Sequence, residues 1–155
     1  MTDPAEHFAG QRDMLRRDRA SAALGMVVEC DEPGEAVVSM RVRDDMTNGF
    51  GITHGGMVFA LADTAFAIAC NEPASGAGAA SGAAGAGEGV TVAAGADISF
   101  LKATRAGQTL TARAHRRALA GRSGLYDVTV TDETGEVVAE FRGRSFMTRP
   151  PTVSP

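Results

Sequence analysis

Hydrophobic residues form one nearly unbroken run at residues 57–70, and Asp63 is the single charge within it. A membrane-spanning helix needs about 20 apolar residues, so this shorter run predicts a buried helix in a soluble protein and no membrane partner. Residues at helical spacing form one apolar stripe suited to the inner face of a sheet: Val58, Leu61, Ala65 and Ile68. Asp63 points away from this stripe, so the other side of the helix carries a carboxylate.

Extended runs of residues flank this helix. Before it, two runs enclose an Asp-Glu-Pro-Gly turn at 31–34, the signal of a β-hairpin. After it, four segments have strand character: 90–102, 108–119, 125–131 and 136–147. Because short glycine-containing turns separate these segments, we expect neighbouring antiparallel strands in a meander. The predicted fold class is α+β, with an antiparallel sheet covering one long helix.

Two further segments complete the outline of the chain. Asp3 and Pro4 are typical of a helix start, which predicts a polar helix from residue 4 to about residue 20. The tract 73–89 has no large side chain and cannot bury enough apolar surface to offset its ordering entropy, so we expect a flexible surface insertion. The 155 residues predict a single domain over 1–155, with its core at about 21–148.

Composition excludes several classes of function. Hydrophobic residues make up 44% and charged residues 22% of the chain, and the formal net charge is −4, which argues against nucleic acid as a partner. Cys30 and Cys70 lack a neighbouring ligand pattern and are interpreted as reduced thiols. The N-terminus is charged and shows no apolar signal region, so we expect a cytoplasmic protein. No metal-ligand cluster, phosphate-binding glycine motif or Ser-His-Asp order appears, and we expect no cofactor.

Groups suited to acyl chemistry stand at the start and in the middle of the predicted helix. Gly55 and Gly56 begin it, where backbone N–H groups lack intrahelical acceptors and can polarise a carbonyl. Asp63 can act on that carbonyl as base or nucleophile. About 12 Å of helix separates Gly55 from Asp63, so both reach one carbon only if two helices run antiparallel across a dimer axis. Since one sheet covers only one side of the helix, we expect a homodimer with two shared sites.

A purely structural interpretation fits the same residues. Asp63 and Thr64 are typical of an N-cap for a second helix after a break. His54 suits a hydrogen-bonded core histidine, and the Gly-Gly pair suits a tight turn. Burial between Phe59 and Phe66 would raise the pKa of Asp63, whereas a helix N-terminus would lower that pKa. From spacing alone, both interpretations stay open.

The run NGFGITHGGMVFALADTAFAIACN at residues 48–71 resembles the signature of the hotdog-fold acyl-CoA thioesterases. The resemblance is strongest to the PaaI-type phenylacetyl-CoA thioesterases of phenylacetate degradation. It continues through DISFLKATRAGQTLTARA, GLYDVTV and VVAEFRGRSF, and covers about residues 24–146 apart from the insertion. The resemblance implies a hotdog fold, in which the antiparallel sheet wraps around the central helix. It also implies dimers that pair into tetramers.

The resemblance assigns roles to residues of this motif. Asp63 is implied as the catalytic carboxylate, which either activates water or attacks the thioester. Gly55 is implied to polarise the thioester carbonyl through its N–H, and Asn48 to orient the water or the acyl group. His54 is implied to support this region rather than act as base. Thr64 either contacts the substrate or satisfies its hydroxyl on the helix.

Other residues are implied to bind the substrate. Gly56 lies beside the carbonyl donor, and Phe59 and Phe66 suit an aromatic acyl group, although they suit alkyl chains too. Lys102 and Arg122 are candidates for contacts with the phosphates of coenzyme A. Charged residues at solvated strand edges are the alternative interpretation for both.

The expected activity is hydrolysis of phenylacetyl-CoA or a related aryl-acyl-CoA to the free acid and coenzyme A. A medium-chain acyl-CoA thioesterase and a noncatalytic acyl-CoA-binding hotdog protein are the alternatives. The intact pair of Asp63 and Gly55 favours an enzyme, because a binding protein has no use for a costly buried carboxylate. A hotdog hydratase fits less well, because His54 belongs to a different motif.

Overall fold

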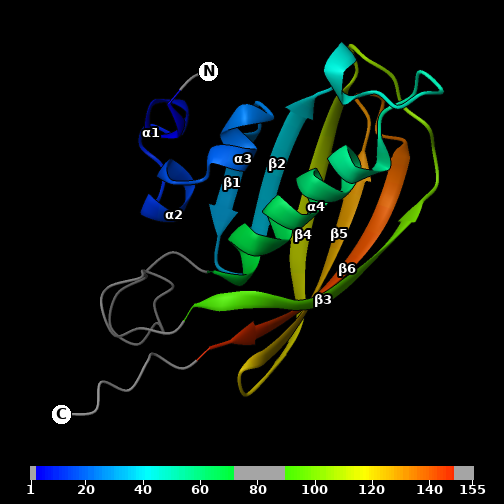
Figure 1. Cartoon of the computed structure of the whole chain (residues 1–155). Coiled ribbons are helices and arrows are strands. Elements are labelled where there is room, and N and C mark those ends of the chain that lie inside the picture. Colours follow the sequence, from blue (N-terminus) through cyan, green and yellow to red (C-terminus); the bar gives the residue numbers. More distant parts are fainter. Residues whose placement is uncertain (1–2, 72–89, 149–155) are drawn as a thin grey trace.

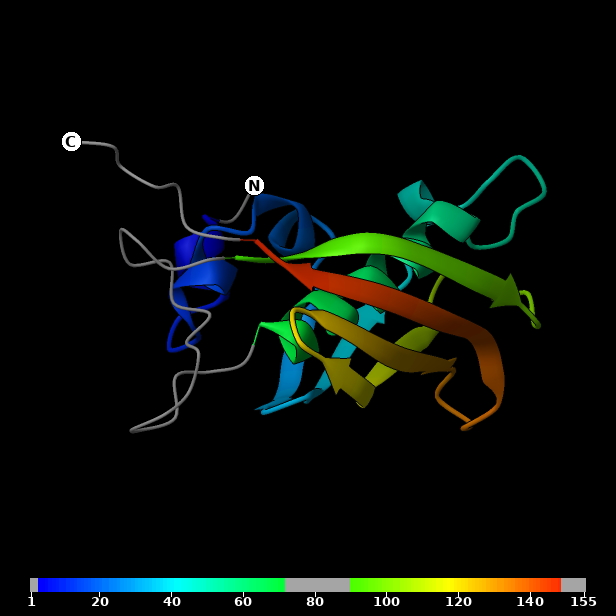
Figure 2. The same cartoon turned by 90° about the horizontal axis from the view of Figure 1, so that it is seen from below.

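The computed structural model describes residues 3–71 and 90–148, in which an antiparallel sheet curves around one long helix (Figures 1 and 2). The helices are α1 (Pro4–His7), α2 (Asp13–Arg16), α3 (Arg19–Ala23) and α4 (Gly55–Cys70), with a 3-10 turn at Asp44–Met46. The strands are β1 (Val27–Glu32), β2 (Glu35–Arg41), β3 (Thr91–Phe100), β4 (Thr109–Ala120), β5 (Ser123–Thr131) and β6 (Val137–Met147). This confirms the predicted α+β hotdog fold.

The sheet has the strand order β1-β2-β4-β5-β6-β3, and every neighbouring pair is antiparallel. The predicted β1–β2 hairpin and the β4–β5–β6 meander are confirmed. The expectation that β3 lies beside β4 is wrong. β2 already occupies that edge of β4 over the whole register from Glu35↔His115 to Arg41↔Thr109. The connection 101–108 instead carries the chain from the far edge, where β3 pairs with β6 (Figure 1).

Helix α4 packs its predicted stripe onto the sheet. Val58 is 3% exposed, and Leu61, Ala65 and Ile68 are fully buried. The helix lies close to the sheet at Gly143 of β6, where a Cβ atom would approach the ring of Phe66 to 2.8 Å. Glycine at that position therefore allows the helix to sit in the curve of the sheet.

The N-terminal region forms three short helices, and the prediction of one polar helix is wrong. Gly10 has φ +82°, a left-handed conformation that breaks a helix. Asp18 then starts α3 as an N-cap, because its carboxylate accepts from the Ser21 N–H at 2.9 Å. Phe8 and Leu15 are buried, so this region belongs to the core rather than to a polar surface.

Arg12 ties this region to the end of α4. Its guanidinium forms a bidentate ion pair with Asp31 of β1, at 2.6 and 2.9 Å. It also donates to the carbonyls of Ile68 (3.2 Å) and Asn71. A cation on these carbonyls complements the negative C-terminal end of the helix dipole. The position of α4 is thus set by its packing on the sheet and by this contact at its end.

Three remaining expectations concern the insertion, the thiols and the membrane. The predicted insertion at 73–89 lies outside the described residues. Cys30 and Cys70 are both free thiols, as predicted. Within residues 3–71 and 90–148, every helix is too short or too polar to cross a membrane.

Candidate active site

The first turn of α4 leaves one backbone donor free. His54 is the N-cap, with extended φ −63° and ψ 130°, and its Nδ1 accepts from the Gly56 N–H at 2.9 Å. The Met57 N–H donates to the His54 carbonyl at 2.8 Å. No described residue accepts from the Gly55 N–H. Since the helix dipole is positive here, this free N–H is a preorganised donor for a carbonyl or oxyanion.

The His54 N-cap changes two expectations, one about the free N–H groups and one about the burial of His54. Sequence treats the N–H groups of Gly55 and Gly56 as equivalent free donors, but the Gly56 N–H is bound by the His54 ring. The histidine is exposed rather than a core residue. Because Nδ1 is the acceptor, the neutral ring carries its proton on Nε2. His54 thereby leaves the Gly55 N–H as the free donor of this pair.

The loop before α4 holds Asn48 in a defined orientation. The side-chain oxygen of Asn48 accepts from the Phe50 N–H at 2.9 Å, and its backbone N–H donates to the Ile52 carbonyl at 2.9 Å. The hydroxyls of Thr53 and Thr104 lie 2.7 Å apart and anchor the end of the loop. The Asn48 NH₂ group has no acceptor within residues 3–71 and 90–148.

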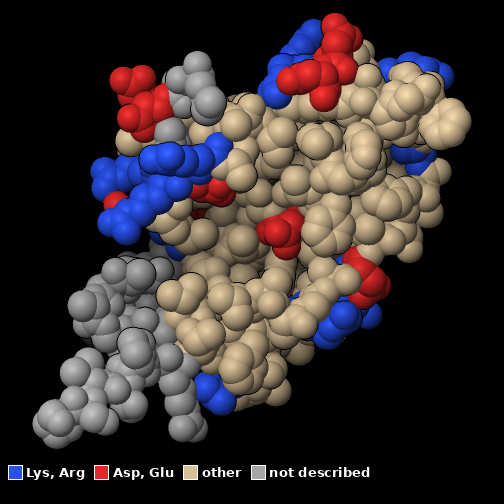
Figure 3. Space-filling view, in the orientation of Figure 1, with Lys and Arg blue, Asp and Glu red and all other residues tan. Residues whose placement is uncertain are grey.

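Asp63 lies half-buried on the side of α4 that the sheet does not cover. Burial raises the pKa of its carboxyl above the ordinary value. Within one chain, burial is the cause of this shift, because about 12 Å of helix separates Asp63 from the N-terminus of α4. Its carboxylate has no hydrogen-bond partner in the described part of the chain. Figure 3 shows this face as largely uncharged, with one acidic group near its centre. Asp63 is the single carboxylate of α4.

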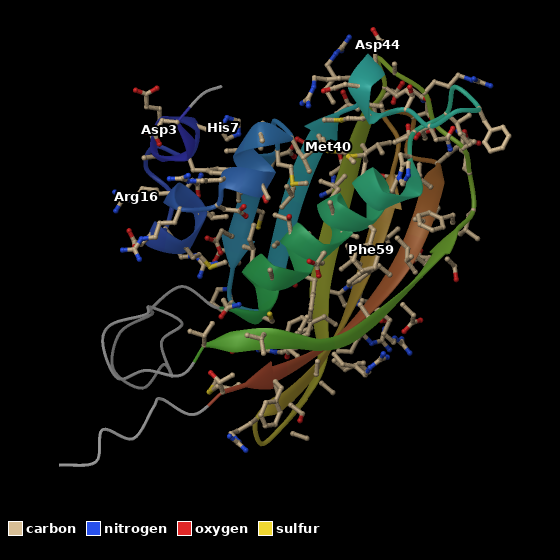
Figure 4. All side chains as sticks on the ribbon, viewed as in Figure 1. Asp3, His7, Arg16, Met40, Asp44 and Phe59 are labelled. Atoms are coloured by element: carbon tan, nitrogen blue, oxygen red, sulfur yellow. The ribbon has the colours of Figure 1, made fainter. Side chains whose placement is uncertain are left out.

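The structure places Phe59, Phe66 and Thr64 differently around α4. Phe66 is 1% exposed, so it is a core residue and the expected contact with an acyl group is not open to it. Phe59 is partly buried on α4 (Figure 4). The centres of the Phe59 and Phe141 rings lie 5.4 Å apart in an edge-on arrangement. The Thr64 hydroxyl lies 3.1 Å from that of Ser21 in α3, which satisfies it within the fold.

The two candidate phosphate contacts lie at opposite ends of β5. Lys102 forms ion pairs with Asp132 (2.6 Å) and with Glu136, next to the β5–β6 turn. Arg122 lies in the β4–β5 turn, with its guanidinium 4.5 Å from the centre of the Phe146 ring. A strand of this length spans about 30 Å, so one chain does not bring both cations to one pair of phosphates.

One residue beside the site, Phe100, is not predicted from the sequence. Phe100, at the end of β3, lies against the start of α4, and a Cβ atom on Gly55 would be 3.1 Å from its Cζ atom. Sequence reasoning misses it because it places β3 beside β4. Its large apolar side chain at the end of a strand was the available signal.

The sheet wrapped around one helix, with a free donor at the helix start and an unpaired carboxylate on its open face, defines a hotdog-type hydrolase of activated acyl groups. The family model of the thioesterase superfamily matches residues 50–139, which contain both groups. The chain belongs to this superfamily and is a thioester hydrolase.

Known proteins of this family resemble the whole described fold. The acyl-coenzyme A thioesterase PaaI of Escherichia coli (strain K12) is 39% identical over 132 residues, which cover 85% of this chain and 84% of that protein. The solved structure of the E. coli PaaI protein matches with a TM-score of 0.78 at 34% identity, covering 96% of this chain and 98% of the other. A mutant of the phenylacetic acid degradation protein PaaI from Thermus thermophilus matches with a TM-score of 0.69 at 35% identity, covering 83% and 97%.

Proposed function

We propose that this enzyme hydrolyses phenylacetyl-CoA or a related aryl-acyl-CoA to the free acid and coenzyme A, in the cytoplasm. The observation that carries the proposal is the pairing of a free Gly55 N–H with an unpaired, half-buried Asp63 on the same helix. The identity to the E. coli acyl-coenzyme A thioesterase PaaI, over most of both chains, supports the substrate class.

The proposed chemistry uses Gly55 to polarise the thioester. Its N–H donates to the carbonyl oxygen and stabilises the negative charge that develops there. Asp63 takes a proton from water as the water oxygen bonds to the carbonyl carbon. The C–S bond then breaks, and the thiolate of coenzyme A leaves and takes up a proton. In the nucleophilic route, Asp63 bonds to the carbonyl carbon, the thiolate leaves, and water cleaves the resulting anhydride.

A shared site between two subunits brings these groups together. About 12 Å of helix separates Gly55 from Asp63 in one chain, whereas antiparallel α4 helices would place Gly55 of one subunit opposite Asp63 of the other. Two observations support this dimer. The sheet does not cover the Asp63 side of α4, and among the described strands β3 lies at an edge and pairs with β6 alone. Pairing of such dimers into a tetramer is part of the proposal.

The experiment that tests the function is thiol release from a panel of acyl-CoAs by the wild type and Asp63→Asn. The panel contains phenylacetyl-, hydroxyphenylacetyl-, benzoyl-, acetyl-, hexanoyl- and palmitoyl-CoA. We expect fast release from the aryl-acetyl members, and a loss of about 10²–10⁴-fold in kcat for the variant. Preference for hexanoyl-CoA would keep the mechanism and assign a medium-chain substrate. Binding without thiol release from any member would identify a noncatalytic acyl-CoA-binding protein.

A further inference from the structure

Phe100 reaches the start of α4 from the opposite edge of the sheet. On β3, the alternate residues Ala96 and Ile98 pack against the core, so Phe100 two residues on points to the same inner face. Its backbone position is set by β6, because Phe100 pairs with Ala139 and the following Leu101 N–H donates to the Val138 carbonyl at 2.8 Å. The strand thus fixes the backbone from which the ring projects, and 55% of the residue is exposed.

The ring covers the backbone of Gly55. A Cβ atom there would lie 3.1 Å from Cζ and 3.5 Å from Cε1 and Cε2 of Phe100. Carbon atoms ordinarily approach to about 3.5–4.0 Å, so the ring leaves little room for a side chain. In a helix the Cα–Cβ bond tilts toward the N-terminus, the direction in which the first N–H groups also point. The ring therefore borders the side from which a ligand reaches the Gly55 N–H.

We propose that Phe100 forms the wall of the acyl site beside the Gly55 donor, where it contacts the acyl group and determines which acyl groups are accepted. This inference rests on the proposed function, because it assumes a carbonyl bound at Gly55. An aryl group next to that carbonyl meets an aromatic ring, which adds an edge-to-face or offset contact that an alkyl chain does not make. A side chain at position 55 would require the Phe100 ring to shift by a few tenths of an ångström.

The structure supplies a matched control. Leu101, the residue that follows the end of β3, is 63% exposed and is not among the atoms nearest to a Cβ on Gly55. Its truncation removes a comparable apolar surface without touching Gly55. Phe100→Leu keeps an apolar side chain and loses only the aromatic ring.

The test compares Phe100→Ala, Phe100→Leu and Leu101→Ala in two measurements. One is kcat/KM for phenylacetyl-CoA relative to hexanoyl-CoA. The other is the Kd of 3-phenyl-2-oxopropyl-CoA, in which a methylene group between sulfur and carbonyl prevents hydrolysis. We expect both Phe100 variants to lower the aryl-to-alkyl ratio and weaken binding of the analogue by about 2–12-fold, with Leu101→Ala unchanged. Equal ratios and equal Kd values in all variants would overturn the inference.

Failure of the proposed function gives a different result. If the wild type binds the analogue but releases no thiol from any acyl-CoA, the proposed hydrolysis is wrong. Weaker binding of the analogue by Phe100→Ala would in that case still support a contact between Phe100 and the acyl group. Wild type that does not bind the analogue overturns both proposals.

A double-mutant cycle tests the contact without any substrate. We expect Gly55→Ala to lower the unfolding temperature in the wild type and to lower it less in the Phe100→Ala background, where the added methyl has room. Additive effects would contradict the contact between Phe100 and Gly55.

Discussion

At the scale of single residues, two substitutions of Gly55 test the N–H donor and the space beside it. Gly55 is the first residue of α4, the position at which proline is tolerated in a helix. The preceding His54 has the extended φ and ψ that a following proline requires. Gly55→Pro therefore removes the N–H while keeping the helix, but its ring also adds carbon atoms on the side of Phe100. Gly55→Ala keeps the N–H and adds only the β-carbon.

We expect Gly55→Pro to lower kcat by about 10²–10³-fold, the usual effect of losing one oxyanion donor. Gly55→Ala is the steric control, and we expect a smaller loss because its N–H remains. Steady-state thiol release measures both variants, and circular dichroism checks that α4 is retained. Equal losses in the two variants would show that space, and not the donor, limits the reaction.

Asp63 makes a second prediction at this scale, because burial raises the pKa of its carboxyl. Activity requires the carboxylate, so we expect kcat/KM to fall as the pH drops through this raised pKa, at a higher pH than for an ordinary Asp. The pH profile of kcat/KM measures this. A fall in kcat/KM centred at or below the usual aspartate pKa of about 3.9 would contradict this prediction.

The same shift has a consequence for stability. A raised folded pKa means that the folded state binds its proton more tightly than the unfolded chain does. The contribution of Asp63 to stability therefore falls as the pH rises from the ordinary aspartate pKa through the folded pKa. We expect Asp63→Asn to be more stable than the wild type at neutral pH, with the difference shrinking below the ordinary pKa. Urea unfolding at equal protein concentration measures it.

At the scale of elements, the packing of α4 depends on the close approach at Gly143. A Cβ atom there would lie 2.8 Å from the ring of Phe66, which is buried and cannot turn to solvent. We expect Gly143→Ala to reduce the free energy of unfolding by about 1–3 kcal/mol. Gly49→Ala is the control, because its Cβ would meet no atom within 4 Å. Chemical denaturation compares the two variants. Adding Phe66→Leu to Gly143→Ala should restore part of the lost stability. An unchanged free energy of unfolding in Gly143→Ala would show that the sheet moves to make room for the methyl group.

The individual elements follow closely from the sequence. The four strand segments after the helix, expected at 90–102, 108–119, 125–131 and 136–147, correspond to β3, β4, β5 and β6. Alternation and glycine turns are local signals, and local signals determine where a strand starts and ends. The N-terminal helices are harder to predict, because the break at Gly10 and the burial of Phe8 depend on contacts with the rest of the fold.

At the scale of the whole molecule, the proposed site is complete only when two chains combine. Asp63→Asn keeps the Gly55 donor, and Gly55→Pro keeps the carboxylate. In a mixed dimer, one of the two sites joins the intact Gly55 of one chain with the intact Asp63 of the other. Complementation between two inactive variants therefore tests the arrangement directly.

We expect co-refolded Asp63→Asn and Gly55→Pro to recover about a quarter of the wild-type activity, since random pairing makes half of the dimers mixed and each mixed dimer has one intact site. Each variant refolded alone is the control and should stay inactive. Thiol release from phenylacetyl-CoA measures the recovery, and sedimentation confirms that dimers form. No recovery in a confirmed mixed dimer would place both groups of a working site in one chain.

The sequence by itself determined the class of fold, the long buried helix and the two groups of the proposed chemistry. These depend on hydrophobic periodicity and on the motif from Asn48 to Asp63, which are local properties of the chain. Tertiary structure decided what depends on contacts between distant segments. It moved β3 to the edge beside β6, brought Phe100 over Gly55, and paired Lys102 with Asp132.

The His54 N-cap shows, within a single turn, the difference between what the sequence determines and what the tertiary structure decides. The residues His54, Gly55 and Gly56 predict donors at a helix start, but the side-chain rotamer decides which donor remains free. A pattern of residue types specifies which groups are present. Their partners are set by the packed fold, because a hydrogen bond requires a distance and an angle that sequence spacing does not contain.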